Sequence, residues 1–350
     1  MSEYLAPAIA ELGGLAHGDV AGQVFHQYAS FCDAQLHNPD LNADFDRIRR
    51  MRDTRAKEME HFKQLARTTK DKSLKDKYVK EFRKTSKWFN LDEKEYDRLR
   101  IARESFMTQS LENYLLALSA SDSNDNDVLR FFALWLEFAD SELANTSVGK
   151  HLASVPTAKF VRLMNQLSSR LQSDQTAFQE LLSDLVLHIA IDHPYHSMHH
   201  ISAGSSSISA TASESARSRM NAARAIAGKL KVASDRETSI NWHNISSTDR
   251  LYDRLAKLHD NKGPRDTAFR AGRDLALDDY PEGKALTTRI KDFKLPPPTM
   301  DIPVRYDKIY SKVPRIMGFL PKMRIANGLS APKIVVARCS DGQSFKQLVR

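Results

Sequence analysis

The chain has 350 residues, of which 41% are hydrophobic and 27% charged, and its net charge is +8. The length exceeds that of most single cores and the composition excludes a disordered polymer, so we expect two regions with a real hydrophobic core. Neither a run of eighteen apolar residues nor a signal-peptide pattern occurs, which predicts no membrane span and no secretion. Cys32 and Cys339 lack the spacing of zinc ligands or disulfide frameworks, and we expect both to be buried.

The excess positive charge lies in one segment. Between Asp46 and Glu104 there are 20 Lys and Arg against 12 Asp and Glu, a difference of +8. Apolar residues recur every three or four positions over 45–66 and 74–88, and TTKDK at 68–72 separates the two runs. We therefore expect two long antiparallel helices. Because the charges are mixed in sign, we interpret them as a solvated face; nucleic-acid binding by this hairpin is the alternative.

Further helices are predicted over 101–118, 128–138 and 178–191, and from Thr157 onward, because apolar residues recur there at helical spacing. The 128–138 segment is apolar almost all round, which predicts deep burial. A helix-loop-helix repeat of roughly 20–30 residues is typical of an α-solenoid, in which each helix pair buries its apolar face against its neighbours. The fold class is therefore predicted to be mainly α.

A histidine-rich stretch, DHPYHSMHH, occupies residues 192–200. Four of the chain's 12 histidines lie there: His193, His196, His199 and His200. The spacing of His196 from the two that follow would place imidazoles on one helix face, as a metal site requires. The alternative is a plain helix start, with Asp192 as the N-cap and Pro194 at the first helical position.

The last third of the chain differs from the rest in composition and in hydrophobic pattern. AGSSSISATA (203–212) predicts a flexible connection, followed by helices near 214–233, 247–259 and 265–279. Three consecutive prolines in LPPPTMDIPV (295–304) rule out helix and favour an extended crossing. Short β-branched runs with NG and DG turn signals then predict an antiparallel β-meander. The turn at Asn327 and Gly328 is either a plain hairpin or a loop whose N–H groups can approach phosphates.

Several of these motifs together resemble the phosphatidylinositol-3-kinase-related protein kinases, in particular the branch of the ataxia-telangiectasia-mutated kinase and its fungal telomere-maintenance counterpart. PPTMDIPV (297–304) resembles the signature that precedes the kinase N-lobe. RIANGLSAPKIV (324–335) resembles the first strand, glycine-rich loop and second strand, and SDGQSFKQLV (340–349) the strand that leads to the ATP lysine. VLRFFALWLEFAD (128–140) and VPTAKFVRLMNQLSSRL (155–171) are similar to helices of the FAT domain, the helical solenoid that clasps the kinase.

The resemblance implies three parts: the C-terminal part of a FAT domain over 1–203, a flexible connection with further helices over 204–294, and a truncated kinase N-lobe over 295–350. It implies that seven residues form the loop over the ATP phosphates: Ile325, Ala326, Asn327, Gly328, Leu329, Ser330 and Ala331. Lys333 would be structural. Arg350 would either replace the ATP lysine or directly precede it.

The resemblance also bears on the histidine-rich stretch. The family has an Asp-His-Pro-x-His helix start at this point, in a region that binds no metal. His199 and His200 stand where the family carries apolar residues, so we interpret them as surface substitutions. No metal ligand is therefore assigned in this chain.

Phosphoryl transfer needs a base and groups that hold Mg²⁺, and the family's Asp-Arg-His-x-x-Asn and Asp-Phe-Gly strings do not occur in this sequence. The resemblance thus implies an inactive fragment of a protein serine/threonine kinase, with no catalytic residue and no tight ATP binding of its own. The whole kinase would use ATP and Mg²⁺ to phosphorylate Ser or Thr before Gln.

The family implies a nuclear enzyme of the DNA-damage response, telomere maintenance and checkpoint signalling. Its partners would be protein substrates, a DNA-end-binding recruitment complex and a possible second copy of itself, with no membrane and no direct nucleic-acid contact. The alternative from a different class is a non-enzymatic α-solenoid scaffold that binds protein partners. That alternative explains the helices but not the β-meander.

Overall fold

The computed structural model describes residues 7, 11, 17–206, 211–258, 269–328 and 330–350. The chain divides into two compact units, Met1–Val155 and Pro156–Arg350, and each is described by itself. The predicted boundaries at 203/204 and 294/295 do not coincide with this division, and they stay predictions.

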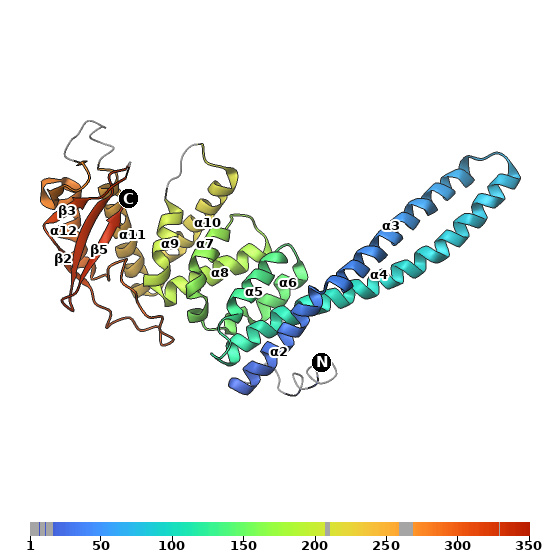
Figure 1. Cartoon of the computed structure of the whole chain (residues 1–350), viewed down its shortest axis with the longest axis horizontal. Helices are drawn as coiled ribbons and strands as arrows, with labels where there is room; N and C mark the ends of the chain where they lie inside the picture. The colour runs from blue at the N-terminus through green and yellow to red at the C-terminus, as the bar shows by residue number, and fades with distance from the viewer. Residues whose placement is uncertain (1–6, 8–10, 12–16, 207–210, 259–268, 329) are drawn as a thin grey trace. The chain divides into compact units, whose positions relative to one another are not determined.

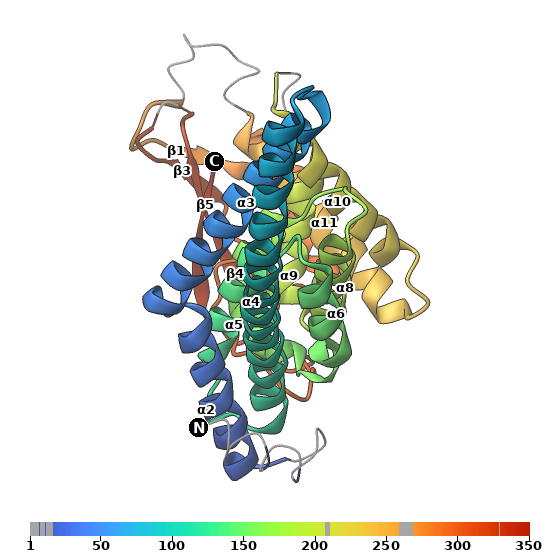
Figure 2. The same cartoon turned by 90° about the vertical axis from the view of Figure 1, so that its right-hand side faces the viewer.

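The first unit is helical. Its elements are α2 (Asp19–Leu36), α3 (Pro39–Thr68), α4 (Lys72–Ala120), α5 (Asp127–Glu137), α6 (Glu142–His151) and the 3₁₀ turn η1 (Leu152–Ser154). Helices α3 and α4 lie side by side as a long antiparallel hairpin (Figures 1 and 2), as the sequence predicted. Asn38 and Asp71 each accept hydrogen bonds from the first backbone N–H groups of the helix that follows them, so both helices of the hairpin are capped.

Helix α4 runs unbroken for 49 residues. The predicted break at 68–72 is confirmed. The sequence predicted two separate helices over 74–88 and 101–118, and this is wrong because both ranges belong to one helix. The physical reason is that residues 89–100 contain neither Gly nor Pro, so nothing there terminates the helix. The second arm of the hairpin is therefore one continuous helix.

Helix α5 is deeply buried on most of its faces, as its apolar pattern predicted. Phe131, Leu134 and Trp135 have no exposed surface, whereas Leu129 is 56% exposed. The indole N–H of Trp135 donates to Asn145 Oδ1 at 2.8 Å, which satisfies the one polar atom of this buried ring.

The second unit begins with helices and ends in a sheet. Its helical elements are η2 (Thr157–Leu163), α7 (Met164–Arg170), α8 (Ala177–Asp192), α9 (Pro194–Ser205), α10 (Glu214–Lys231), α11 (Arg236–Ala256), η4 (Leu277–Asp279) and α12 (Pro281–Phe293). Helix α11 begins well before the predicted start near 247, and α12 was not predicted. Part of the predicted connection, 207–210, lies outside the described residues.

The sheet comprises β1 (Asp274–Ala276), β2 (Ile316–Phe319), β3 (Lys322–Ile325), β4 (Lys333–Cys339) and β5 (Ser344–Val349), all antiparallel. Strands β2 and β3 pair with successive parts of β4, and β5 pairs with the same strand along 333–338. The predicted meander is confirmed.

The α-helix predicted at 265–279 is wrong for its described part, 269–279, where strand β1 and the 3₁₀ turn η4 lie instead. Gly272 has a φ of +81° and donates its N–H to Ile325 O at 2.8 Å, and strand β1 follows directly. A left-handed glycine together with strand pairing to β3 excludes helix there. The sheet therefore includes a strand from before the proline-rich segment.

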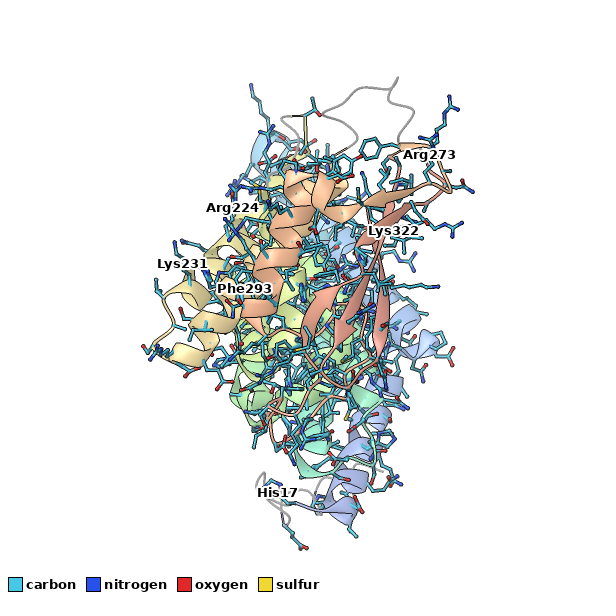
Figure 3. All side chains as sticks on the ribbon, turned by 90° about the vertical axis from the view of Figure 1, so that its left-hand side faces the viewer. His17, Arg224, Lys231, Arg273, Phe293 and Lys322 are labelled. Carbon is cyan, nitrogen blue, oxygen red and sulfur yellow. The ribbon has the colours of Figure 1, made fainter. Side chains whose placement is uncertain are left out.

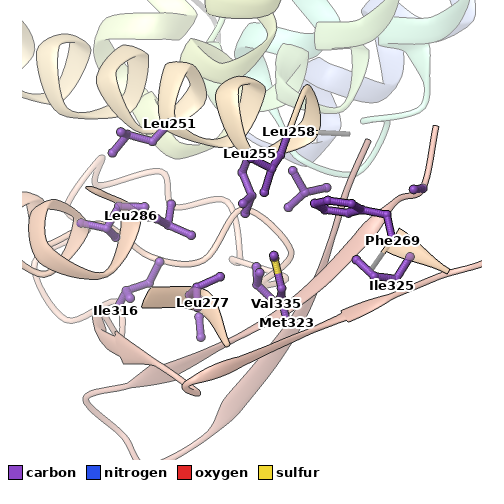
Figure 4. Packing of buried hydrophobic residues seen from close by; sticks show 14 residues of the cluster. Leu251, Leu255, Leu258, Phe269, Leu277, Leu286, Ile316, Met323, Ile325 and Val335 are labelled. Atoms are coloured by element: carbon purple, nitrogen blue, oxygen red, sulfur yellow. The ribbon is translucent and has the colours of Figure 1, made fainter. Parts of the chain in front are cut away.

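One hydrophobic core joins this sheet to two helices (Figure 4). Leu251 and Leu255 of α11 pack with Leu258, two residues beyond its end, against Met323, Ile325 and Val335 of the strands. Leu286 and Ile290 of α12 complete the cluster. Figure 3 shows Phe293 at the end of α12, and Arg273 and Lys322 at the β1 and β3 side of the sheet. The helices thus cover one face of the sheet.

Two further predictions concern the whole chain. Cys32 and Cys339 are free thiols and both are buried, as expected. In the part of the chain that the structure describes, no helix is both long and apolar enough to cross a membrane.

Candidate functional site

The predicted phosphate loop connects β3 to β4. Asn327, Gly328 and Ser330 are exposed there, whereas Ile325 and Ala331 are buried in the core cluster. Leu329 lies outside the described residues. The side chains of Ile325 and Ala331 therefore anchor the loop, and Asn327, Gly328 and Ser330 are the described residues that a ligand can reach.

The loop's shape depends on its backbone. Ala326 N–H donates to Pro332 O at 2.7 Å, and Ala331 N–H donates to Gly328 O at 3.1 Å, so the connection closes over seven residues and is not a two-residue hairpin turn. Gly328 has a φ of +150°, and a Cβ there would lie 3.1 Å from Pro332 Cδ. Ala331 has a φ of +43°, which non-glycine residues rarely adopt. This strain is held by the burial of Ala331.

Arg350 is placed next to this loop by strand register. Val349 pairs with Lys333, the first residue of β4 after the loop. Arg350 follows Val349 and is exposed. Because side chains alternate along a strand, Arg350 shares a face with Leu348 and Lys346, opposite the core face. A permanent cation thus stands beside the exposed loop.

The second face of the sheet lies opposite helices α11 and α12. Ile334 and Val336 are half-buried on this face, and Leu348 beside them is 49% exposed. Cationic side chains on the same face surround this apolar centre: Arg324, Arg338 and Lys346. An apolar patch with a cationic rim suits a flat, anionic ligand such as a nucleotide. The alternation of side chains in KIVVARC and SFKQLV is the sequence signal for this face, which was not among the predicted site residues.

Lys333 faces away from the loop. Its side chain is fully buried, and its Nζ donates to Ala256 O at the end of α11 at 2.6 Å. The ammonium also lies 5.8 Å from the ring centroid of Phe269. A cation at a helix C-terminus is favourable because the last carbonyls have no intrahelical donors. The geometry agrees with the structural role expected for Lys333.

The histidine-rich stretch lies at the junction of α8 and α9. Pro194 is the first residue of α9, as predicted, but Asp192 is the last residue of α8 and does not cap α9. Within the described ranges, no group of three or more His, Cys, Asp or Glu is arranged to hold a metal ion. His199 is not a plain surface residue, since its Nδ1 lies 2.7 Å from Asp249 Oδ1.

The α3–α4 hairpin carries its charges unevenly. Near its base, opposite charges are paired, for example Arg100 with Glu104 at 2.9 Å and Arg55 with Asp92 at 2.5 Å. From Arg67 to Lys87 there are nine Lys and Arg against three Asp and Glu, and the nine cations make no ion pair among the described residues. The outer end of the hairpin is therefore a cationic, solvated surface.

Curated relatives are similar to this chain over nearly all of its residues. The chain is 42% identical over 347 residues to "Serine/threonine-protein kinase tel1" of Neurospora crassa and 41% identical over 350 residues to that of Emericella nidulans. These alignments cover 99% and 100% of the chain. The solved structure "FAT and kinase domain of CtTel1" superposes on 99% of the chain with a TM-score of 0.86 and 41% identity.

The chain belongs to the Tel1 family. It spans 12% of the length of both curated Tel1 relatives and 22% of the CtTel1 FAT and kinase structure. "Structure of the open conformation of CtTel1" gives a TM-score of 0.88 at 41% identity. No family model matches the chain. The predicted resemblance and the predicted fold class, helices followed by a small antiparallel sheet, are both confirmed by these Tel1 structures.

Proposed function

We propose that this chain supplies the last FAT helices and the first N-lobe strands of a nuclear protein serine/threonine kinase that acts in DNA repair, checkpoint signalling and telomere maintenance. The whole kinase transfers the γ-phosphate of ATP to Ser or Thr before Gln. The observation that carries the proposal is the exposed loop at Gly328, placed by strand register beside a cation and a partly apolar sheet face.

The residues present fit the nucleotide but not the metal. The exposed N–H groups near Asn327 and Gly328 can donate to phosphate oxygens, Arg350 can hold a phosphate charge, and Ile334 and Leu348 can pack against a base. ATP supplies the transferred phosphoryl group when it is bound. The carboxylate and amide groups that hold Mg²⁺ in the family belong to strings that this sequence lacks. The chain's own contribution is therefore binding and orientation.

The first test concerns nucleotide binding by this chain. Because it offers only one wall of a cleft, we expect calorimetry with Mg-ATP to give a Kd weaker than micromolar. Micromolar affinity would show that the loop and sheet face suffice alone. A titration with Mg²⁺ and inorganic phosphate serves as the control, since it separates phosphate attraction by Arg350 from recognition of the base.

The second test concerns the whole kinase. The reading frame after codon 350 is expected to encode strings like Asp-Arg-His-x-x-Asn and Asp-Phe-Gly, and an open frame without them would contradict the proposal. In the longer polypeptide, Arg350→Met should lower kcat/KM for ATP roughly tenfold, because one charge-assisted phosphate contact is lost. Arg289→Met, at an exposed position of α12 on the opposite side of the sheet, is the matched control. Equal effects of both variants would deny Arg350 a special role.

The proposal includes partners. Two solved relatives are titled "Complete CtTel1 dimer with C2 symmetry" and "Tel1 kinase butterfly symmetric dimer", which supports a homodimer for the whole protein. Protein substrates and a DNA-end-binding recruitment complex follow from the family resemblance. The second candidate function, a scaffold for protein partners, is favoured by the unpaired cations at the outer end of the hairpin and by Trp88 beside them, which is 51% exposed.

A further inference from the structure

Two segments of the second unit that lie more than a hundred residues apart in sequence are packed against each other. The first is the junction of α8 and α9, residues 192–196, and the second is the irregular segment 301–310 that precedes β2. The ring of Tyr310 lies 5.8 Å from that of Tyr195 and 5.5 Å from that of His196, measured between centroids. His196 Nε2 lies 2.8 Å from Ile302 O and must donate to it, because a carbonyl only accepts.

The hydrogen bonds of Tyr310 have a fixed direction. Its hydroxyl oxygen accepts the backbone N–H of Arg305 at 3.2 Å and lies 2.7 Å from His193 Nδ1. On the other side of the imidazole, Thr157 Oγ1 gives its only proton to the Asp192 carboxylate, so Nε2 of His193 must donate to that hydroxyl, and Nδ1 is left to accept the proton of Tyr310. Nδ1 of His193 is therefore the acceptor, and a neutral imidazole then carries its proton on Nε2.

The chain of hydrogen bonds continues on the other side of the ring. Nε2 of His193 lies 3.2 Å from Thr157 Oγ1, and that hydroxyl donates its own proton to Asp192 Oδ2 at 2.7 Å. The same carboxylate oxygen accepts Lys308 Nζ at 2.8 Å. Each polar atom named in this path has a hydrogen-bond partner, and the path ends at the Asp192 carboxylate, which is paired with Lys308.

The turn that carries Lys308 is strained. Lys308 has a φ of +59°, a conformation that residues with a Cβ rarely adopt. Asp307 holds the turn, since its carboxylate accepts Ile309 N–H at 3.0 Å and pairs with both Arg305 Nε and Nη2. The strain is the cost of directing Lys308 back to Asp192 while Tyr310 faces His193.

We propose that segment 301–310 is held closed against residues 192–196 by a directed path of hydrogen bonds. The path runs from Arg305 through Tyr310, His193 and Thr157 to Asp192. We call this contact the latch. His193 has no exposed surface and Tyr310 is 8% exposed, so water cannot replace the lost partners cheaply. Residues 311–315 join segment 301–310 to β2, and Ile316 of β2 pairs with Cys339 of β4. The latch therefore couples the α8–α9 junction to the sheet and does not depend on what the sheet binds.

Hydrogen-deuterium exchange of the 350-residue chain tests the latch. Tyr310→Phe removes only the hydroxyl, and we expect the backbone amides of 301–314 to exchange three- to tenfold faster, as the loss of one or two net hydrogen bonds implies. Thr157→Val removes the hydroxyl that links His193 to Asp192, and it should also make the backbone amides of 301–314 exchange faster. Tyr195→Phe is the matched control and should leave the exchange of 301–314 unchanged.

Two further results complete the test. Because both variants break one path, the double variant Tyr310→Phe with Thr157→Val should exchange little faster than either single variant. Nitrogen-15 spectra of the imidazoles should show His193 protonated at Nε2 and bare at Nδ1. Unchanged exchange in both single variants, fully additive effects, or a proton on Nδ1 would each overturn the latch.

Discussion

Lowering the pH from 6.5 to about 4 should reduce the free energy of unfolding of the second unit by about 3 kcal/mol through His193 alone. Burial, with smaller effects of the like charges of His196 and Lys308, lowers the pKa of His193 from 6.5 to about 4, although the nearby Asp192 charge opposes the shift. The unfolded chain therefore binds a proton in this range that the folded chain does not. This stability is fully present above pH 6.5 and is lost as the pH falls.

The measurement is a pair of urea titrations at pH 7 and pH 4.5, read by pulsed hydrogen exchange so that each unit is followed separately. His193→Asn keeps an acceptor near Tyr310 but cannot titrate, so its unfolding free energy should change less between the two pH values than that of the unmodified chain. His188→Asn changes an exposed histidine of the neighbouring α8 and should behave like the unmodified chain. Equal pH dependence in all three proteins would show that His193 is not held neutral by its site.

The helical part of the fold could be predicted where capping and hydrophobic spacing agree. Asn38 and Asp71 precede apolar stripes, and the hairpin follows from them. Helix α12 was not predicted, although it carries the same signals: Pro281 at its first position, and Leu286 four residues before Ile290. It could therefore have been predicted from the sequence. Strand β1 could not be found this way, because three residues carry no periodicity and their pairing partner lies near Arg324.

The candidate site was predictable in sequence position but not in orientation. The Asn-Gly turn signal and the family resemblance placed the loop at Gly328, whereas the burial of Ile325 and Ala331 depends on helices that pack from elsewhere in the chain. The direction of Lys333 depends on Ala256, 77 residues earlier. The histidines of α9 were interpreted as a helix start, and their partner Tyr310 lies between the motifs at 297–304 and 324–335, in a stretch for which no element was predicted. Long-range pairing of polar groups is the information that local patterns lack.

Asp33 is expected to be the most sensitive polar position of the first unit. Its carboxylate accepts Arg130 Nε at 2.5 Å and Nη2 at 2.6 Å, and the hydroxyl of Tyr114 at 3.0 Å. Asp33 is only 7% exposed. Burial raises the pKa of this carboxyl, but the hydrogen bonds and charge of Arg130 outweigh burial and lower it on balance. Helices α2, α4 and α5 thus meet at one paired carboxylate.

Asp33→Ala should therefore lower the free energy of unfolding of the first unit by roughly 1–3 kcal/mol, because it leaves the buried Tyr114 hydroxyl without its acceptor and removes the partner of the Arg130 guanidinium, which water can still reach. Asp33→Asn should cost less, since its amide oxygen can still accept from Tyr114. Asp46→Asn breaks an exposed pair with Arg49 and should change stability by less than about 0.5 kcal/mol. Urea unfolding followed by exchange in α2 and α5 measures all three. A loss in Asp33→Ala no larger than that in Asp46→Asn would mean that water replaces the carboxylate, and that apolar packing alone holds these three helices together.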